Sequence, residues 1–223
     1  KPTPLIATKS LSVCSGNSVS LTPINGSGDI VPAGTLYTWS VLNSTIISGE
    51  TNNTSASTSF SSGILSHTLN STPASLNYTV TAVADGCSTD FNIAVEVKPT
   101  PVISGKSIAL CSGTLAAVSP INGNGDIVPS GTIYSWSVPT SASLLGMTAG
   151  NAQSAFGQTL TNISGADQSI TYTVTPNSAG CIGSSFAVTA NIKFEPTPQI
   201  SGAQSICSGE SVQLFVNGGA TYN

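Results

Sequence analysis

The sequence predicts an all-β fold of tandem antiparallel β-sandwich domains arranged as an extended rod. Three observations support this prediction. Only 6% of the 223 residues are charged, and Ser, Thr, Val, Ile, Gly and Asn are abundant, a composition that favours strands and turns over helices. Long segments recur at one fixed distance along the chain. Several short runs alternate apolar and polar side chains, which is the pattern of strands with one buried face.

The repeat divides the chain into domains. The segment 22–41, TPINGSGDIVPAGTLYTWSV, recurs at 119–138 as SPINGNGDIVPSGTIYSWSV, and Pro-Thr-Pro segments begin at Lys1, Lys98 and Glu195, so each step is 97 residues. A period of this length matches one β-sandwich domain of ~100 residues. We therefore expect repeats at 1–97 and 98–194, and the N-terminal part of a third at 195–223. Prolines at each junction favour stiff, extended linkers and hence the rod.

Alternating runs place the strands of the first repeat at 18–22, 36–41, 77–82 and 91–97, and corresponding runs occur in the second repeat. In the run 36–41, Tyr37, Trp39 and Val41 share one face, and we assign them to the core rather than to a sugar-stacking platform. The segment from Asn43 to Asn70 is less regular, and we expect two or three short strands there.

The five cysteines predict disulfide bonds. Each whole repeat has one early and one late cysteine, which predicts the pairs Cys14–Cys87 and Cys111–Cys181 and leaves Cys207 with a partner outside the fragment. Zinc is poorly supported, because no CxxC spacing occurs and His67 is the only histidine. Disulfides imply an oxidising compartment, so we expect a secreted or cell-surface protein.

Residues for catalysis are not recognisable in the sequence. We interpret His67 as a surface residue, because the aligned stretch GQTLTNI of the second repeat has no histidine. No nucleophile, metalloprotease or phosphate-binding motif is found. With five lysines, no arginine and a net charge of −4, the chain has no basic patch for nucleic acid, and no apolar run is long enough to span a membrane. We expect neither an enzyme nor a cofactor.

Asp29 and Asp126 lie in the segments NGSGDIVP and NGNGDIVP, which differ least between the repeats. They are weak calcium candidates, because each loop offers one carboxylate and a calcium site generally needs several oxygen ligands. We favour the alternative that Asn25–Gly26 and Asn122–Gly123 form turns, and that each aspartate caps the loop backbone.

The recurring KPTP, CSG, NGxGDIVPxGT, YxWSV and YTVT…GC segments resemble the tandem PKD-like and Ig-like repeats of giant surface adhesins from Bacteroidetes. The resemblance covers both whole repeats, whereas the third unit is more similar to Ig-like modules. In that family such modules are stalk or adhesive repeats, exported across the outer membrane, commonly by type IX secretion. Some serve cell adhesion or gliding motility, and others accompany polysaccharide-degrading enzymes. The resemblance implies no catalytic residues.

These observations predict a structural or adhesive segment of a large extracellular protein, a disulfide-stabilised stalk that projects a binding region. Expected partners are neighbouring repeats of the same chain, surface glycans and other cell-surface proteins. The alternative is a carbohydrate-binding or spacer module of a secreted polysaccharide-degrading enzyme. An exposed row of aromatic side chains would favour that alternative.

Overall fold

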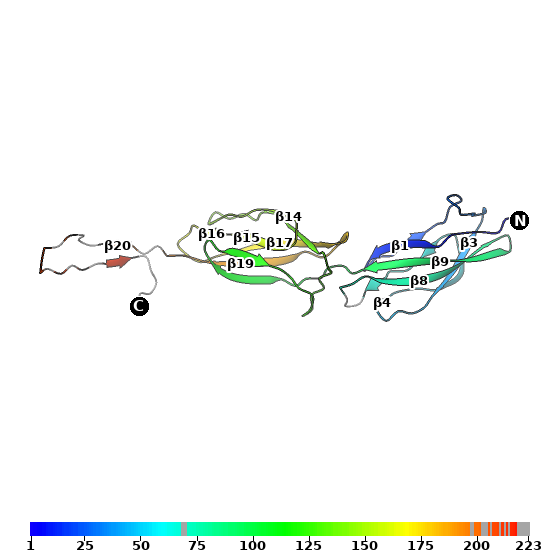
Figure 1. The fold of residues 1–223 in the computed structure, drawn as a ribbon, viewed down its shortest axis with the longest axis horizontal. Coiled ribbons are helices and arrows are strands. Elements are labelled where there is room, and N and C mark those ends of the chain that lie inside the picture. The colour runs from blue at the N-terminus through cyan, green and yellow to red at the C-terminus, as the bar shows by residue number, and fades with distance from the viewer. Residues whose placement is uncertain are drawn as a thin grey trace. The chain divides into compact units, whose positions relative to one another are not determined.

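The computed structural model describes residues 1–67, 71–196, 199–201, 205, 207–209, 211, 213 and 215–217. Within these ranges every regular element is a β-strand (Figure 1), which confirms the all-β prediction. The chain divides into two compact units. The first holds the whole first repeat and three segments of the second; its ranges are Lys1–Ser104, Pro120–Tyr134 and Thr175–Ser185. The other unit holds Gly105–Ser119, Ser135–Val174 and Phe186–Asn223.

The main sheet of the first repeat has five strands, and its neighbours are antiparallel except at one edge, where β1 runs parallel to β9. The order across the sheet is β1 (Lys9–Cys14), β9 (Cys87–Lys98), β8 (Ala74–Ala84), β3 (Leu36–Val41) and β5 (Asn53–Ser57). Two short antiparallel pairs complete the repeat: β2 (Ser20–Leu21) with β6 (Phe60–Ser61), and β4 (Ile47–Ser48) with β7 (Ser66–His67).

The second repeat forms its sheet in the same order, again with a parallel edge pair, β10 with β19. The strands are β10 (Lys106–Cys111), β19 (Phe186–Lys193), β17 (Gln168–Ser178), β12 (Ile133–Trp136) and β14 (Gly150–Gln153), with β18 (Cys181–Ile182) on β17. The short pairs are β11 (Leu115–Val118) with β15 (Phe156–Thr159), and β13 (Leu144–Leu145) with β16 (Thr161–Asn162). In the third repeat, β20 (Gln199–Ser201) pairs with β21 (Phe215–Asn217).

The core of the first repeat lies between the main sheet and the short strand pairs. Phe60 of β6 is fully buried, and its ring centroid lies 5.3 Å from that of Trp39 and 4.9 Å from that of Tyr78. Such edge-on contacts between buried rings are favourable beyond the area they bury. The second repeat builds the same contacts around Phe156. Each repeat is therefore a two-layer β unit with an aromatic centre.

The strand predictions are confirmed best where alternation is strongest. The strand β3 has the predicted bounds 36–41, and the runs 77–82 and 91–97 lie inside the longer strands β8 and β9. The run 18–22 contributes only Ser20–Leu21. Four short strands, β4 to β7, occupy the described part of 43–70, where we expected two or three.

The solvent-facing side of the sheets carries hydroxyl groups in cross-strand pairs. Thr81 donates a hydrogen bond to Asp90 across β8 and β9 at 2.7 Å. The hydroxyls of Thr171 and Thr189 lie 3.0 Å apart across β17 and β19. Opposed polar pairs of this kind stabilise adjacent strands, and the threonine pair does so without a charged group.

Candidate functional site: the disulfide between the repeats

One disulfide joins the first repeat to the second. Cys14, the last residue of β1, is bonded to Cys181, the first residue of β18; the two Cα atoms lie 5.6 Å apart, and the cysteines are 167 residues apart in sequence. That Cα separation is usual for a disulfide. Both cysteines belong to the first compact unit. The bond closes a loop that contains most of both repeats.

This bond corrects the pairing predicted from the sequence, because neither Cys14–Cys87 nor Cys111–Cys181 forms. The parallel register places Cys14 beside Lys98, the last residue of β9, whereas Cys87 is the first residue of that strand. The two ends of this 12-residue strand lie roughly 36 Å apart at a rise of ~3.3 Å per residue step. A disulfide cannot bridge Cα atoms more than 7 Å apart without backbone movement.

The same geometry separates the cysteines of the second repeat. Cys111 lies beside Lys193, the last residue of β19. Cys181 lies opposite Ser178, the last residue of β17, and Gln168 at the other end of β17 lies opposite Ile192. The two cysteines therefore occupy opposite ends of the sheet. The missed signal is the alternating segment KSLSVC at 9–14, which forms an edge strand parallel to the last strand of its repeat.

The backbone next to Cys14 is fixed by hydrogen bonds to the linker. The N–H of Ser15 donates to the carbonyl oxygen of Lys98 at 2.8 Å, and the hydroxyl of Thr100 donates to the carbonyl oxygen of Ser15 at 3.1 Å. Cys181 follows a tight turn in which Ala179 and Gly180 have φ of 49° and 87°. Positive φ at both positions is the requirement of the tightest hairpins, so Cys181 is held by a rigid turn.

Three described cysteines remain as thiols: Cys87, Cys111 and Cys207. Cys87 is half-buried, whereas Cys111 and Cys207 are exposed. The expected partner of Cys207 lies outside the fragment, so that pairing stays a prediction. Cys87 and Cys111 are free because their predicted partners, Cys14 and Cys181, are bonded to each other.

Asp29 caps a backbone segment outside its own loop, whereas the sequence interpretation placed the cap within that loop. Its Oδ1 accepts a hydrogen bond from the N–H of Ala7 at 2.9 Å, and its Oδ2 pairs with the ammonium of Lys9. The hydrogen bond from Lys9 and the bond from Ala7 hold the pKa of Asp29 below its ordinary value of 3.8. The side-chain oxygen of Asn25 accepts a hydrogen bond from the N–H of Val31 at 3.2 Å and so closes the turn.

Asp126 repeats this arrangement in the second repeat. Its Oδ1 accepts bonds from the N–H and the hydroxyl of Ser104, at 2.8 Å and 2.7 Å, and Asn122 accepts the N–H of Val128 at 3.1 Å. Among the described residues no three His, Cys, Asp or Glu side chains gather in a group able to hold a metal ion. The geometry of both aspartates is that of a structural cap.

Both tryptophans are core residues. Trp39 and Trp136 are buried, and each indole N–H donates at 3.0 Å to a backbone carbonyl oxygen, that of Thr51 or Thr148. This confirms their assignment to the core.

His67 is buried, in contrast to the surface position expected for it. Its backbone N–H donates to the hydroxyl of Ser15 at 2.8 Å, as the N–H of Asn162 donates to that of Ser112 at 3.0 Å. The structural counterpart of His67 is therefore Asn162 rather than Gln158, the residue aligned with it in the stretch GQTLTNI. Burial lowers the pKa of His67 below its ordinary value of 6.5, and a backbone hydrogen bond with Thr72 partly offsets that effect.

Sequence comparison assigns both repeats to one family. The family model of the PKD-like domain matches residues 11–101 and again residues 109–196, which together make up most of the chain. The chain belongs to the PKD-like domain family. Domains of this family and a disulfide together indicate an extracellular protein, and the fold is of a kind typical of non-enzymatic domains. Among curated proteins, none matches the sequence significantly.

Fragments of titin, DIP-gamma and protocadherin gamma B2 are among the solved structures that match this chain. An I-band fragment of titin is 12% identical, with 96% of this chain and 74% of that chain covered and a TM-score of 0.38. The IG1+IG2 fragment of DIP-gamma is 11% identical, with 87% and 99% covered and a TM-score of 0.38. The extracellular cadherin domains 1–5 of protocadherin gamma B2 are 13% identical, with 93% and 43% covered and a TM-score of 0.30.

The PKD-like chain spans about half the length of the protocadherin structures that it matches. Within the described part of the chain, no helix is long and apolar enough to cross a membrane.

Proposed function

We propose that these PKD-like repeats form a disulfide-stabilised stalk in a large secreted or cell-surface protein and project a binding region for cell adhesion or gliding motility. The observation that carries the proposal is the Cys14–Cys181 bond, which ties two successive repeats covalently. Each repeat also has its own aromatic core. The resemblance to repeats of Bacteroidetes adhesins supports export across the outer membrane by type IX secretion.

A stalk must resist elongation when its ends are pulled, and the disulfide provides that resistance directly. Tension applied to the two ends passes through the sulfur–sulfur bond and bypasses the 167-residue loop that the bond closes. In the chain-entropy model, closing a loop of this size stabilises the folded state by about 5 kcal/mol. The bond therefore limits both unfolding and extension.

Single-molecule pulling of the 223-residue chain tests this role. The oxidised chain should not release the loop, whereas reduction should add roughly 600 Å of contour length at ~3.6 Å per residue. A Cys87→Ser variant serves as the control, because Cys87 is outside the bond, and it should behave like the parent chain. Oxidised molecules that extend in two separate steps of one repeat each would contradict the stalk role.

The second candidate function is a carbohydrate-binding or spacer module of a secreted polysaccharide-degrading enzyme. A shallow hollow of about 260 Å³ on the first repeat favours it; the hollow is lined mostly by hydroxyl and amide side chains, including Thr38, Ser40, Asn53 and Thr81. Such groups can hydrogen-bond sugar hydroxyls. A glycan array probed with the chain separates the two functions: selective binding that Asn53→Ala removes would favour the carbohydrate-binding module.

A further inference from the structure

The early cysteine of the second repeat, Cys111, has the same surroundings as Cys14 but no bond. Cys14 lies beside Lys98 and Cys111 beside Lys193 in the two parallel pairs. The carbonyl oxygens of the two cysteines accept equivalent hydrogen bonds, from the N–H of Asn17 at 3.1 Å and from that of Thr114 at 3.2 Å. Cys111 is exposed.

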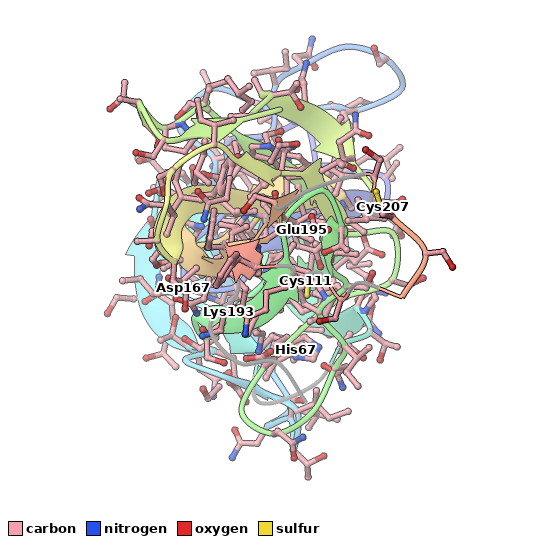
Figure 2. The ribbon with its side chains drawn as sticks, turned by 90° about the vertical axis from the view of Figure 1, so that its left-hand side faces the viewer. His67, Cys111, Asp167, Lys193, Glu195 and Cys207 are labelled. Carbon is pink, nitrogen blue, oxygen red and sulfur yellow. A yellow bond between two sulfur atoms is a disulfide. The ribbon has the colours of Figure 1, made fainter. Side chains whose placement is uncertain are left out.

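Two further contacts extend the equivalence. The N–H of Gly16 donates a hydrogen bond to the carbonyl oxygen of Leu65, and the N–H of Gly113 donates one to the carbonyl oxygen of Leu160, both at 2.8 Å. The serine that follows each cysteine accepts a backbone N–H through its hydroxyl, at 2.8 Å in the first repeat and 3.0 Å in the second. Figure 2 shows Cys111 near Lys193, the residue that it faces in the register. The backbone that holds Cys14 ready for a bond is therefore present again around Cys111.

The late cysteines are equivalent as well. Cys87 follows Asp85 and Gly86, with φ of 50° and 83°, as Cys181 follows Ala179 and Gly180, with φ of 49° and 87°. Cys87 lies opposite Ala84, and Cys181 lies opposite Ser178, in the same kind of hairpin. Early and late cysteines thus occupy opposite ends of both whole repeats, and the bond that forms joins the early cysteine of the first repeat to the late cysteine of the second.

We propose that Cys111 is the attachment point for the next repeat, the one that begins at Glu195, and that it bonds to the late cysteine of that repeat. The sequence carries the same arrangement forward, because Pro-Thr-Pro follows Glu195 as it follows Lys98, and Cys207 stands in the early position of the third repeat. Each early cysteine then bonds to the late cysteine of the following repeat, so that every repeat of the stalk is cross-linked to the next. This claim concerns which sulfur atoms join and does not depend on what the stalk binds.

Formation of the bond is a two-electron oxidation. The Cys111 thiolate attacks the disulfide of a thiol oxidoreductase, and the resulting mixed disulfide is then attacked by the thiolate of the partner cysteine. The Cys111 sulfur bonds to the partner sulfur, both cysteines lose their thiol protons, and the oxidoreductase is released with two thiols. Exposure of Cys111 leaves its sulfur accessible for the first attack.

Peptide mapping of the natively exported parent polypeptide tests the proposal. The protein is isolated without reductant in N-ethylmaleimide and digested, and cross-linked peptides are identified by mass spectrometry. The Cys111 peptide should be linked to a cysteine peptide C-terminal to Asn223, and the Cys14–Cys181 peptide serves as the internal control. Cys111 carrying maleimide, or linked to Cys87, Cys181 or Cys207, would overturn the proposal.

A variant gives a second, independent readout. In the parent polypeptide, Cys111→Ser should expose one new thiol beyond Asn223 and leave the Cys14–Cys181 bond intact. Because Cys111 is exposed on an edge strand, this replacement removes no core side chain. A variant that gains no labelled thiol beyond Asn223 would also overturn the assignment.

Discussion

His67 and Asn162 occupy the same position in the two repeats, each donating its backbone N–H to a serine hydroxyl, that of Ser15 or Ser112. The asparagine side chain donates to the carbonyl oxygen of Ala166 at 2.9 Å, and it remains uncharged at any pH. The histidine is buried and titrates. The two repeats should therefore respond differently to acid.

We expect the first repeat to lose stability as the pH falls through about 6.5. Because burial lowers the pKa of His67 in the folded state, the unfolded chain binds the proton more readily, so the stabilisation is complete above the unfolded pKa and decreases below it. Urea unfolding at pH 7.5 and pH 5 should show this loss for the parent chain. His67→Asn should reduce it, and Asn162→His should introduce a similar loss in the second repeat.

Thiol counting on the isolated 223-residue chain under non-reducing denaturation should label three of its five cysteines: Cys87, Cys111 and Cys207. Cys14→Ser should add Cys181 to the labelled set and lower the free energy of unfolding by up to about 5 kcal/mol in the chain-entropy model. Cys87→Ser is the matched control and should change stability little. Labelled Cys14 or Cys181 in the parent chain would contradict the observed pairing.

Replacement of Trp39 by Phe should destabilise the first repeat by about 1–3 kcal/mol, because the carbonyl oxygen of Thr51 loses its buried indole donor. Trp136→Phe is the equivalent change in the second repeat. Urea unfolding followed by circular dichroism measures the loss, and the fluorescence of the one remaining tryptophan serves as the control, because it reports unfolding of the unchanged repeat. Equal stability of variant and parent would argue against a role for the bond.

Asp29→Asn should lower the unfolding midpoint at pH 7, since the neutral amide cannot form the ion pair with Lys9. The folded carboxylate has a lowered pKa, so its stabilisation is present above the unfolded value of 3.8 and disappears as the pH falls through the lower folded value. The difference between parent and variant should therefore shrink below about pH 4. If the difference in unfolding midpoint between parent and variant persists undiminished at lower pH, the lost charge of Asp29 is not its cause.

Chelation separates the cap from a calcium site at the same aspartates. Because Lys9 and the N–H of Ala7 engage the two oxygens of Asp29, we expect EDTA and added calcium to leave the thermal midpoint unchanged. A midpoint that rises with calcium in the parent chain but not in Asp29→Asn would establish a metal site instead.

Local patterns in the sequence predicted the strands but not the partner of each strand. Alternation located β3 with its bounds, because Tyr37 and Trp39 point to the core at every second residue. Nothing local in KSLSVC specifies that it pairs with the last strand of its repeat, 84 residues away, or that the pairing is parallel. The cysteine pairing was therefore wrong, since it depended on that register.

The position of His67 was missed for a related reason. The segment around it alternates weakly and lies on a two-residue strand, β7, whose burial arises from packing contacts that no short window contains. By contrast, the turn at Asn25 followed from the types of residue in one short loop, although the partners of Asp29, Ala7 and Lys9, lie outside that loop.

The closed loop between Cys14 and Cys181 has a consequence for damage by extracellular proteases. Exposed positions such as Leu42, which is 89% exposed, lie inside that loop, and exposed loop residues are where backbone cleavage concentrates. After a single cut there, the two fragments remain attached through sulfur. A nicked molecule would therefore keep its ends connected until a reductant separates the pieces.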